Sequence, residues 1–378
     1  MTFDPAREPS TAAAAAHAAI PAVSVPALQP VVIRFGRLGD MVMLTALLNS
    51  LHRRFGRRCL VLAAGPWSRP LLDDHPDVER VWSLPRHSPL GLSLVTWQAL
   101  LAVRASKPGP IYICEYQPRQ VRRIRRLLAW GGITPERCLY ITKELAGARG
   151  HWVERLLQFA TLSPSGIRAA SYPQAPPDSL IAPRLTVSQA ERAELEAWLR
   201  QRNWASRRLI LIQPGNFRTM SRRRERWAQD QADDKAWPEA SWAALLRQVS
   251  AALPDALLIL CGAPQEGPML EEVRRSAACA QVVVAELPLR RLVALCQRAH
   301  SMISIDTGPA HAAAACGLPL LVMYGAESPG EWLPRSPSGS AVVALGGPPR
   351  SRRVDELSVA EVFEAWHAMA SGPPGVRP

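Results

Sequence analysis

Hydrophobic residues along this chain gather in short runs, and stretches with helical spacing separate one run from the next. In the first half the apolar runs fall at residues 31–35, 59–63, 78–83 and 111–114. A short apolar run bounded by turn residues is typical of a buried strand. An amphipathic pattern at residues 41–54 separates the first two runs, and this alternation predicts a parallel sheet with covering helices.

The same alternation returns after a Pro-rich stretch at residues 172–183 that has no periodicity. Ser188 and Glu191 have the spacing of a capping box, so a helix is expected over residues 188–202. Further strands are predicted at 209–213, 256–261, 282–285, 302–305 and 320–324. Further helices are predicted at 238–252, 267–278, 289–298 and 310–316.

These elements predict an α/β protein with two Rossmann-like, doubly wound parallel-sheet domains that face a central cleft. The domains are expected at residues 31–185 and 186–345, and ligands of such sheets bind beyond the carboxyl ends of the strands. Residues 1–30 have the composition of a flexible tail. The segment 346–378 carries a helical pattern that is expected to pack back on the domains.

Charge and cysteine usage narrow the class of protein. The formal net charge of +13 suggests an anionic partner such as a phosphorylated glycolipid, a membrane surface or nucleic acid. Only three of the basic residues are lysines, so a compositional bias of the genome is an alternative source of the excess. Seven cysteines without a Cys-x-x-Cys pair predict reduced thiols in a cytosolic protein. No apolar run approaches the ~18 residues of a membrane span.

The segment at residues 304–311, Ser-Ile-Asp-Thr-Gly-Pro-Ala-His, joins an apolar run to an alanine-rich helix. Pro309 suits a first helical position, and Asp306 or Thr307 can cap the helix. Gly308 lets the backbone approach a ligand. A helix N-terminus entered in this way favours phosphate through its free N–H groups and its dipole. The alternative is an ordinary capped connection between a strand and a helix.

The turn Gly36-Arg37-Leu38-Gly39-Asp40 ends the first predicted strand. A carboxylate at Asp40 can act as a general base toward a bound hydroxyl, or it can simply satisfy the N-terminus of the helix. The Gly-x-Gly-x-x-Gly fingerprint of dinucleotide-binding domains is absent.

Three further groups of residues lie near predicted strand ends or helix starts. Lys235 precedes a helix and can place its charge on a phosphate, or it can pair with the adjacent Asp233 or Asp234. Glu266 follows a strand and can accept hydrogen bonds from a ribose, or it can serve as a first-turn acid. The last group is arginine-rich: an insertion with Arg218, Arg222, Arg223, Arg224 and Arg226, and a helical patch with Arg119, Arg122, Arg123, Arg125 and Arg126.

Taken together, these segments resemble the ADP-heptose:lipopolysaccharide heptosyltransferases, glycosyltransferase family nine, of GT-B architecture. The resemblance covers about residues 31–345, although the Arg-rich insertion is longer than the family minimum and the first 30 residues have no counterpart. The matching pieces, in order, are residues 31–40, 213–215, 235–238, 261–262 with Glu266, and 304–311.

The resemblance implies an inverting, metal-independent transfer of a sugar from a nucleotide-diphosphate donor, with no cofactor required. It assigns Asp40 as the general base and Lys235 as the cation that neutralises the leaving group. The remaining donor contacts that it implies are Gly215, Glu266, Leu287, Asp306, Thr307, Gly308 and His311. The acceptor contacts expected from the basic residues are Arg37, Arg119, Arg122 and Arg123.

The first functional hypothesis is therefore the transfer of heptose from ADP-heptose to the inner core of lipopolysaccharide. The expected partner is an anionic glycolipid, the expected location is the cytoplasm with peripheral contact to the inner membrane face, and no nucleic acid is expected. One alternative keeps this chemistry with another nucleotide sugar or with a protein or other glycan as acceptor. Another alternative is a non-catalytic protein that binds nucleotide sugars or nucleic acid.

Overall fold

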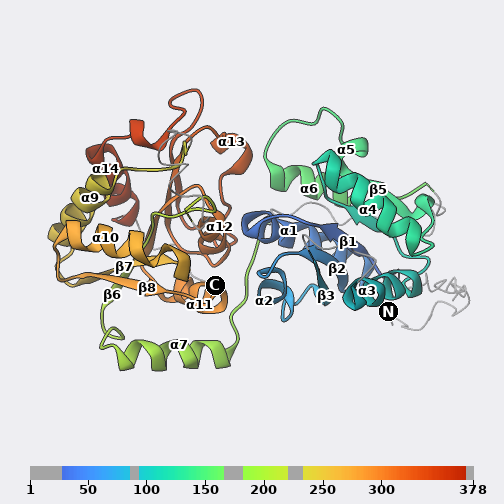
Figure 1. The fold of residues 1–378 in the computed structure, drawn as a ribbon, viewed down its shortest axis with the longest axis horizontal. Helices are drawn as coiled ribbons and strands as arrows, with labels where there is room; N and C mark the ends of the chain where they lie inside the picture. Colours follow the sequence, from blue (N-terminus) through green and yellow to red (C-terminus); the bar gives the residue numbers. More distant parts are fainter. Residues whose placement is uncertain (1–27, 86–92, 166–181, 220–232, 372–378) are drawn as a thin grey trace, which may run out of the picture.

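The computed structural model describes residues 28–85, 93–165, 182–219 and 233–371. The predicted tail therefore lies almost wholly outside the described residues, as do Arg222, Arg223, Arg224 and Arg226 of the Arg-rich insertion. The described chain forms two α/β domains that lie side by side (Figure 1). The predicted class of fold, with two parallel sheets, is confirmed.

The first sheet has the strand order β3-β2-β1-β4-β5, and all its pairings are parallel. Its strands are β1 (Val31–Arg34), β2 (Cys59–Ala64), β3 (Val78–Leu84), β4 (Ile111–Ile113) and β5 (Cys138–Tyr140). The four predicted strands are present. The fifth has only three residues and leads directly into a helix at Ile141, so no turn residues separate the two, and it is absent from the sequence prediction.

Helices cover both faces of this sheet. They are α1 (Leu38–Phe55), α2 (Ser68–Leu72), α3 (Leu94–Ala105), α4 (Pro118–Trp130), α5 (Ile141–Glu144) and α6 (Trp152–Ala160), with a 3₁₀ turn at Pro135–Arg137. The buried sides of α3 and α4 share one core with β1, β2 and β4. The helices α1, α2 and α6 form the core of the opposite face, which is turned toward the second domain (Figure 1).

The second sheet has the order β11-β10-β9-β6-β7-β8, again fully parallel. Its strands are β6 (Arg208–Gln213), β7 (Ala256–Gly262), β8 (Val282–Glu286), β9 (Ser301–Ile305), β10 (Leu320–Tyr324) and β11 (Val342–Gly346). The edge strand β11 is absent from the sequence prediction. Residues 342–345 are all apolar, and the structure pairs this run with β10 at the edge of the sheet.

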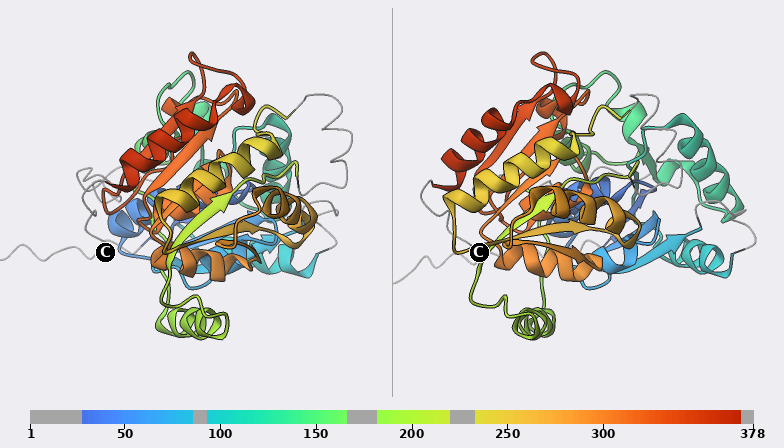
Figure 2. Two further views of the ribbon diagram at one scale, coloured as in Figure 1. Left: turned by 90° about the vertical axis from the view of Figure 1, so that its left-hand side faces the viewer. Right: turned by 60° about the vertical axis from the view of Figure 1, so that its left-hand side comes forward.

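The helices of this domain are α7 (Gln189–Gln201), α9 (Glu239–Ala252), α10 (Gly267–Ala277), α11 (Leu289–Arg298), α12 (Gly308–Ala315), α13 (Pro329–Trp332) and α14 (Val359–Ala370). Two 3₁₀ turns span Pro264–Glu266 and Val354–Glu356. The C-terminal helix α14 lies beside α9 on the second sheet (Figure 2). Its Trp366 is fully buried and donates its Nε1–H to Ser301 Oγ at 3.1 Å. No helix in the described part of the chain is long and apolar enough to cross a membrane.

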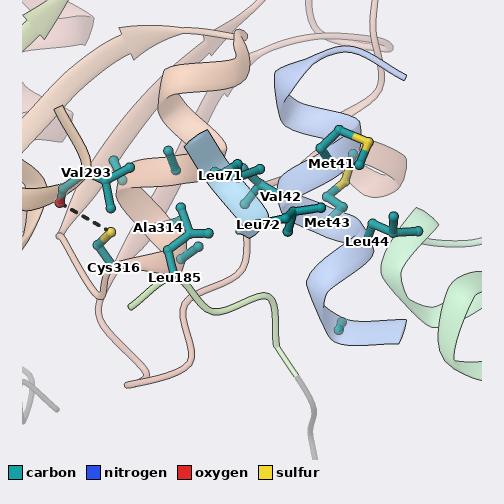
Figure 3. Packing of buried hydrophobic residues seen from close by; sticks show 14 of the residues in the cluster. Met41, Val42, Met43, Leu44, Leu71, Leu72, Leu185, Val293, Ala314 and Cys316 are labelled. Carbon is teal, nitrogen blue, oxygen red and sulfur yellow. Dashed lines mark hydrogen bonds between the residues drawn. The ribbon is translucent and has the colours of Figure 1, made fainter. Parts of the chain in front are cut away.

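The two domains meet where the N-terminal ends of α1 and α12 approach each other. A Cβ on Gly39 would lie 2.8 Å from Cδ2 of His311, and a Cβ on Gly308 would lie 2.8 Å from Cβ of Leu38. Real Cβ atoms do not come this close, so each glycine makes room for a residue of the other domain. Beyond this point, α1 and α2 pack against α11 and α12 in one continuous apolar core (Figure 3).

A second contact between the domains depends on His151, the N-cap residue of α6. Its Nδ1 accepts the N–H of Val153 at 3.2 Å, so its Nε2–H donates to the carbonyl of Leu333 at 2.7 Å. Trp152 stacks on Trp332 next to this bond, with ring centroids 5.8 Å apart. Burial lowers the pKa of His151 from its ordinary 6.5 to about 4. The ring is therefore neutral at pH 7, as this pair of hydrogen bonds requires.

We expect His151 to make the stability of the protein fall as the pH is lowered from about 7 to about 4. In this range the unfolded chain binds a proton at His151 and the folded chain does not, so acid favours unfolding. His151→Asn keeps an N-cap acceptor but cannot titrate, so its free energy of unfolding should depend less on pH than that of the parent. Chemical denaturation at several pH values measures this difference. The matched control is Gln98→Asn, at an exposed position on α3, which introduces an asparagine without removing a titratable group and should keep the parent's dependence.

Candidate active site

A cavity of about 760 Å³ lies between the domains, beyond the carboxyl ends of β1, β4, β6, β7 and β9. The β1–α1 turn forms one wall, and the β9–α12 turn forms part of the opposite wall. Ligands of open α/β sheets bind at such edges. Most of the residues predicted as site residues line this cavity: Gly215, Glu266, Leu287, Asp306, Thr307, Gly308, His311, Lys235, Arg37 and Asp40.

Asp40 lies in the first turn of α1 and is 14% exposed toward the cavity. Its Oδ2 accepts the backbone N–H of Arg37 at 2.7 Å, and its Oδ1 accepts Nη2 of Arg34 at 2.7 Å. Asp40 therefore does satisfy the N-terminus of its helix, which is the structural role that the sequence allowed as an alternative to catalysis. Its position on the cavity wall leaves the same carboxylate available to a ligand.

Arg34 is the buried cation that holds Asp40 in place. Its side chain is 2% exposed and donates to the carbonyl of Cys114 at 2.7 Å, while its Nη1 lies 3.5 Å from Oε2 of Glu115. Burial acts to lower the pKa of Arg34, but Asp40 and Glu115 raise it above its ordinary value, so the guanidinium stays charged. The ring of Tyr116 lies 4.7 Å from the guanidinium carbon.

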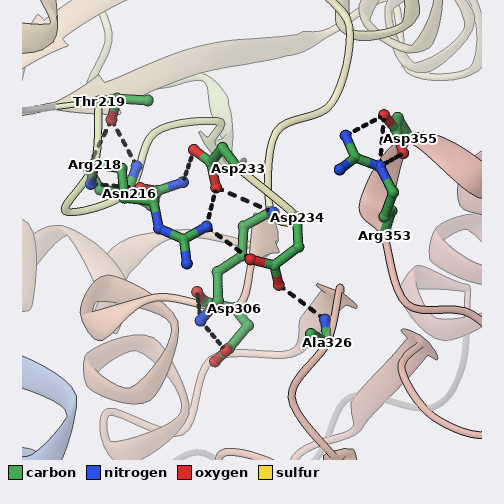
Figure 4. A network of polar contacts seen from close by, with 10 residues as sticks. Asn216, Arg218, Thr219, Asp233, Asp234, Asp306, Ala326, Arg353 and Asp355 are labelled. Atoms are coloured by element: carbon green, nitrogen blue, oxygen red, sulfur yellow. Dashed lines mark hydrogen bonds and ion pairs between the residues drawn. The ribbon is translucent and has the colours of Figure 1, made fainter. Parts of the chain in front are cut away.

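Lys235 forms an ion pair with Asp306 on the opposite side of the cavity. Its Nζ lies 2.5 Å from Oδ2 and 3.3 Å from the backbone oxygen of Asp306 (Figure 4). The side chains are 21% and 9% exposed. The sequence left open a pairing of Lys235 with Asp233 or Asp234. In the structure Arg218 pairs with both of those carboxylates, and its Nη1 lies 2.9 Å from Oδ1 of Asp233 and 2.7 Å from Oδ1 of Asp234.

The β9–α12 turn presents a helix N-terminus to the cavity. Thr307 is the N-cap residue of α12, but neither its side chain nor that of Asp306 caps the helix, since Asp306 is paired with Lys235. The backbone N–H groups of Thr307 and of Gly308, the first residue of α12, have no acceptor within the helix. Such groups form an anion site, and Lys235 offsets the charge of the neighbouring Asp306 carboxylate.

His311 lies one turn into α12 and is 7% exposed. Burial lowers its pKa below the ordinary value, so the ring is neutral near pH 7. It packs against Gly39 of the β1–α1 turn. The position links the two turns on which the cavity depends.

Glu266 and Leu287 line another part of the cavity, beyond β7 and β8. Glu266 is 3% exposed and accepts hydrogen bonds from the N–H of Ala263 at 2.9 Å and from Oγ1 of Thr219 at 2.5 Å. Its Oε1 occupies the space that a Cβ on Gly215 would need, which explains the glycine at that position. Glu266 thus closes its own 3₁₀ turn and also faces the cavity.

The arginines predicted to bind an acceptor separate into two places. Arg37 lies at the cavity, with its guanidinium carbon 4.6 Å from the centre of the Phe217 ring. Arg119, Arg122 and Arg123 lie along α4 and do not line the cavity. Arg123 donates to the carbonyl of Pro85 at 2.7 Å.

Several cavity residues were not predicted from the sequence. Arg34 lies at the end of a strand that reads as apolar, and Glu115 follows β4 with no local motif. The unpredicted aromatic side chains of the wall are Phe35, Trp67, Tyr116, Phe217 and Trp332. Trp67, Tyr116 and Phe217 each follow the end of a strand within four residues, and this position is the signal that could have identified them.

The fold is shared with solved glycosyltransferase structures. The glycosyl transferase family 9 protein from Veillonella parvula superimposes with a TM-score of 0.70 at 14% identity, covering 91% of this chain and 98% of that chain. The ADP-heptose lps heptosyltransferase II of E. coli superimposes with a TM-score of 0.65 at 21% identity, covering 90% of this chain and 98% of that chain. The E. coli heptosyltransferase WaaC with ADP superimposes with a TM-score of 0.62 at 17% identity, covering 90% of this chain and 99% of that chain.

Sequence comparison supplies the family directly. No curated protein sequence matches this chain. The model of glycosyltransferase family 9 (heptosyltransferase) matches residues 146–358, which is more than half of the chain and includes Lys235, Glu266 and the β9–α12 turn. The chain belongs to glycosyltransferase family 9 and is a glycosyltransferase with the two-domain GT-B fold.

Proposed function

We propose that this enzyme transfers heptose from ADP-heptose to the inner core of lipopolysaccharide, with inversion at the anomeric carbon and without a metal ion or other cofactor. The observation that carries the proposal is the arrangement of one cavity. Asp40 lies on the wall from the first domain, and Lys235, Asp306 and the N-terminus of α12 lie on the wall from the second. Two E. coli proteins of the same fold are named for heptosyl transfer.

In the proposed reaction an acceptor hydroxyl oxygen attacks the anomeric carbon of the donor. Asp40 accepts the proton of that hydroxyl as the new C–O bond forms. The bond from the anomeric carbon to the diphosphate oxygen breaks on the opposite face, and ADP leaves with the electron pair. Alignment of the two substrates in one cavity supplies the rest of the rate enhancement.

The second domain is proposed to stabilise the leaving diphosphate. The N–H groups of Thr307 and Gly308 point positive dipoles at it, and Lys235 has three donors, two of which reach Asp306. The third donor of Lys235 is then available to a phosphate oxygen. Asp306, held by Lys235, presents its other oxygen to the sugar hydroxyls.

Glu266 is proposed to accept hydrogen bonds from the ribose, with Gly215 giving the donor close access to the backbone and Leu287 packing against the adenine. Arg37, at the cavity, is proposed to contact the acceptor, and Arg119, Arg122 and Arg123 extend a basic surface away from it along α4. The partner would be an anionic glycolipid at the cytoplasmic face of the inner membrane, and nucleic acid is not a proposed partner.

Calorimetric titration with ADP-heptose, ADP, UDP-sugars and GDP-sugars tests the donor. We expect ADP-heptose and ADP to bind, and the other nucleotides to bind at least about tenfold more weakly, because the base pocket discriminates by its contacts. Preferential binding of a UDP- or GDP-sugar would show that this sugar, and not ADP-heptose, is the donor, and the protein would still be a glycosyltransferase. Failure of every nucleotide sugar to bind would overturn the proposed use of the cavity.

Replacing Asp40 by Asn should lower kcat by roughly 10²–10⁴ and leave the affinity for ADP nearly unchanged, because the amide cannot accept the proton. The amide oxygen of this variant would still accept the N–H of Arg37, so the fold should survive, and the thermal midpoint checks this. Glu115→Gln is the matched control, since Glu115 is the other cavity carboxylate beside Arg34. A larger loss of turnover in Glu115→Gln than in Asp40→Asn would transfer the role of base to Glu115.

A double-mutant cycle separates two roles of Lys235. If Lys235 contacts the diphosphate, Lys235→Met should weaken ADP binding by about tenfold or more both in the parent and in the Asp306→Asn background. If Lys235 only neutralises Asp306, the loss should vanish once Asp306 is an amide. Dissociation constants for ADP from calorimetry complete the cycle, and the exposed Lys143→Met on α5 serves as control.

A further inference from the structure

The outer face of the first domain carries an exposed apolar ridge on α3. Leu94, Trp97 and Leu101 are spaced three and four residues apart, so they lie on one side of this helix. They are 73%, 44% and 65% exposed. The buried side of α3 is formed by Thr96, Ala99, Leu100 and Val103.

A basic stripe lies on the neighbouring helix α4. Arg119, Arg122 and Arg126 follow one another at spacings of three and four, and Trp130 continues the line one turn later with 58% exposure. The opposite side of α4, with Ile124, Leu127 and Leu128, is buried.

The ridge and the stripe belong to one surface. Both helices cover the same face of the first sheet (Figure 1). A Cβ on Gly131, directly after α4, would lie 2.8 Å from Cδ2 of Leu100 on α3. Arg125 lies on another side of α4, where its guanidinium group stacks over the ring of Tyr140 on β5. This α3–α4 face is turned away from the second domain.

Three arginines of the α3–α4 face have no carboxylate partner among the residues that the structure describes. Neither helix contains an aspartate or a glutamate. Within the described parts of the chain, no carboxylate pairs with Arg119, Arg122 or Arg126. The second domain is different, because many of its arginines pair with acids, as in Arg274–Glu271, Arg290–Glu191, Arg350–Glu361 and Arg353–Asp355.

We propose that the α3–α4 face binds the surface of an anionic phospholipid bilayer. Leucines at the crest of a helix can enter the acyl boundary, tryptophan prefers the headgroup level, and arginine attracts lipid phosphate. A symmetric dimer through this face would bring the arginines of α4 against their own copies, which disfavours a second chain as the occupant. The phosphates of nucleic acid match the arginines but leave the leucines without a complement.

Bound in this way, the enzyme would hold its cavity close to the lipid headgroups. The first residues of α4 form the link, because Gln117 and Gln120 line the cavity and Arg119 lies between them. This proposal deepens the membrane location in the proposed function. Vesicle binding needs neither donor nor acceptor, however, so failure of one proposal is distinguishable from failure of the other.

Sedimentation of the full chain with large vesicles tests the proposal. The parent should bind vesicles of phosphatidylglycerol mixed with phosphatidylcholine, and it should bind phosphatidylcholine alone much more weakly. R122E/R126E should lower the partition coefficient on the anionic vesicles by at least about tenfold, since each arginine near the surface contributes to the attraction. L94Q/L101Q should lower it by about tenfold as well, through loss of apolar insertion.

The matched control is R192E/R275E, which makes the same change of net charge at exposed positions on α7 and α10. It should bind within about threefold of the parent at physiological salt, where distant charges are screened. Equal thermal midpoints show that the variants are folded.

Four results would overturn the proposal. One is absence of parent binding to anionic vesicles. The second is retention of binding in L94Q/L101Q, and the third is an equal loss of binding in R192E/R275E. The fourth is a dimer in analytical ultracentrifugation that L94Q/L101Q converts to a monomer, which would assign the face to a second copy of the chain.

Discussion

The close approach of two helix N-termini is the contact on which the rest of this structure depends. Gly39 admits His311, and Gly308 admits Leu38, so α1 and α12 meet at a distance that side chains at these two positions would forbid. Helix α1 follows β1, the central strand of the first sheet, and α12 follows β9, one of the two central strands of the second sheet. Their meeting therefore brings both strand ends to one cavity and points the positive ends of two helix dipoles toward it. An anionic ligand fits that field.

Several charged side chains of the cavity wall are paired with one another. Arg34 lies between Asp40 and Glu115, Lys235 holds Asp306, and Arg218 bridges Asp233 and Asp234. Removal of one member of a buried pair leaves its partner uncompensated, which is costly. A truncation at Lys235 or Asp40 therefore changes the partner as well as the ligand contact. For this reason amide replacements and double-mutant cycles report on the site more cleanly than single alanines.

The first domain divides its two faces between different contacts. The face of α1, α2 and α6 is apolar and buried against the second domain. The face of α3 and α4 combines exposed leucines with Arg119, Arg122 and Arg126, which have no carboxylate partner in the described part of the chain. Helix α4 joins the two regions, because it begins at the cavity and ends on the outer face. Substrate binding and surface attachment can thus occur on one rigid unit.

The sequence by itself determined most strands, the parallel α/β class and the turns that hold Asp40, Glu266 and Asp306, because apolar runs and turn residues act locally. The edge strands β5 and β11 are missing from the sequence prediction although both lie in apolar runs, and only their parallel pairing with β4 and β10 identifies them as strands. Only the tertiary structure decided that Lys235 pairs with Asp306, 71 residues away, rather than with its neighbours Asp233 and Asp234. It likewise placed Glu115 beside Arg34 and left three of the predicted acceptor arginines outside the cavity. Strand order and the packing of one domain on the other set these contacts, and neither can be predicted from the hydrophobic periodicity of a single segment.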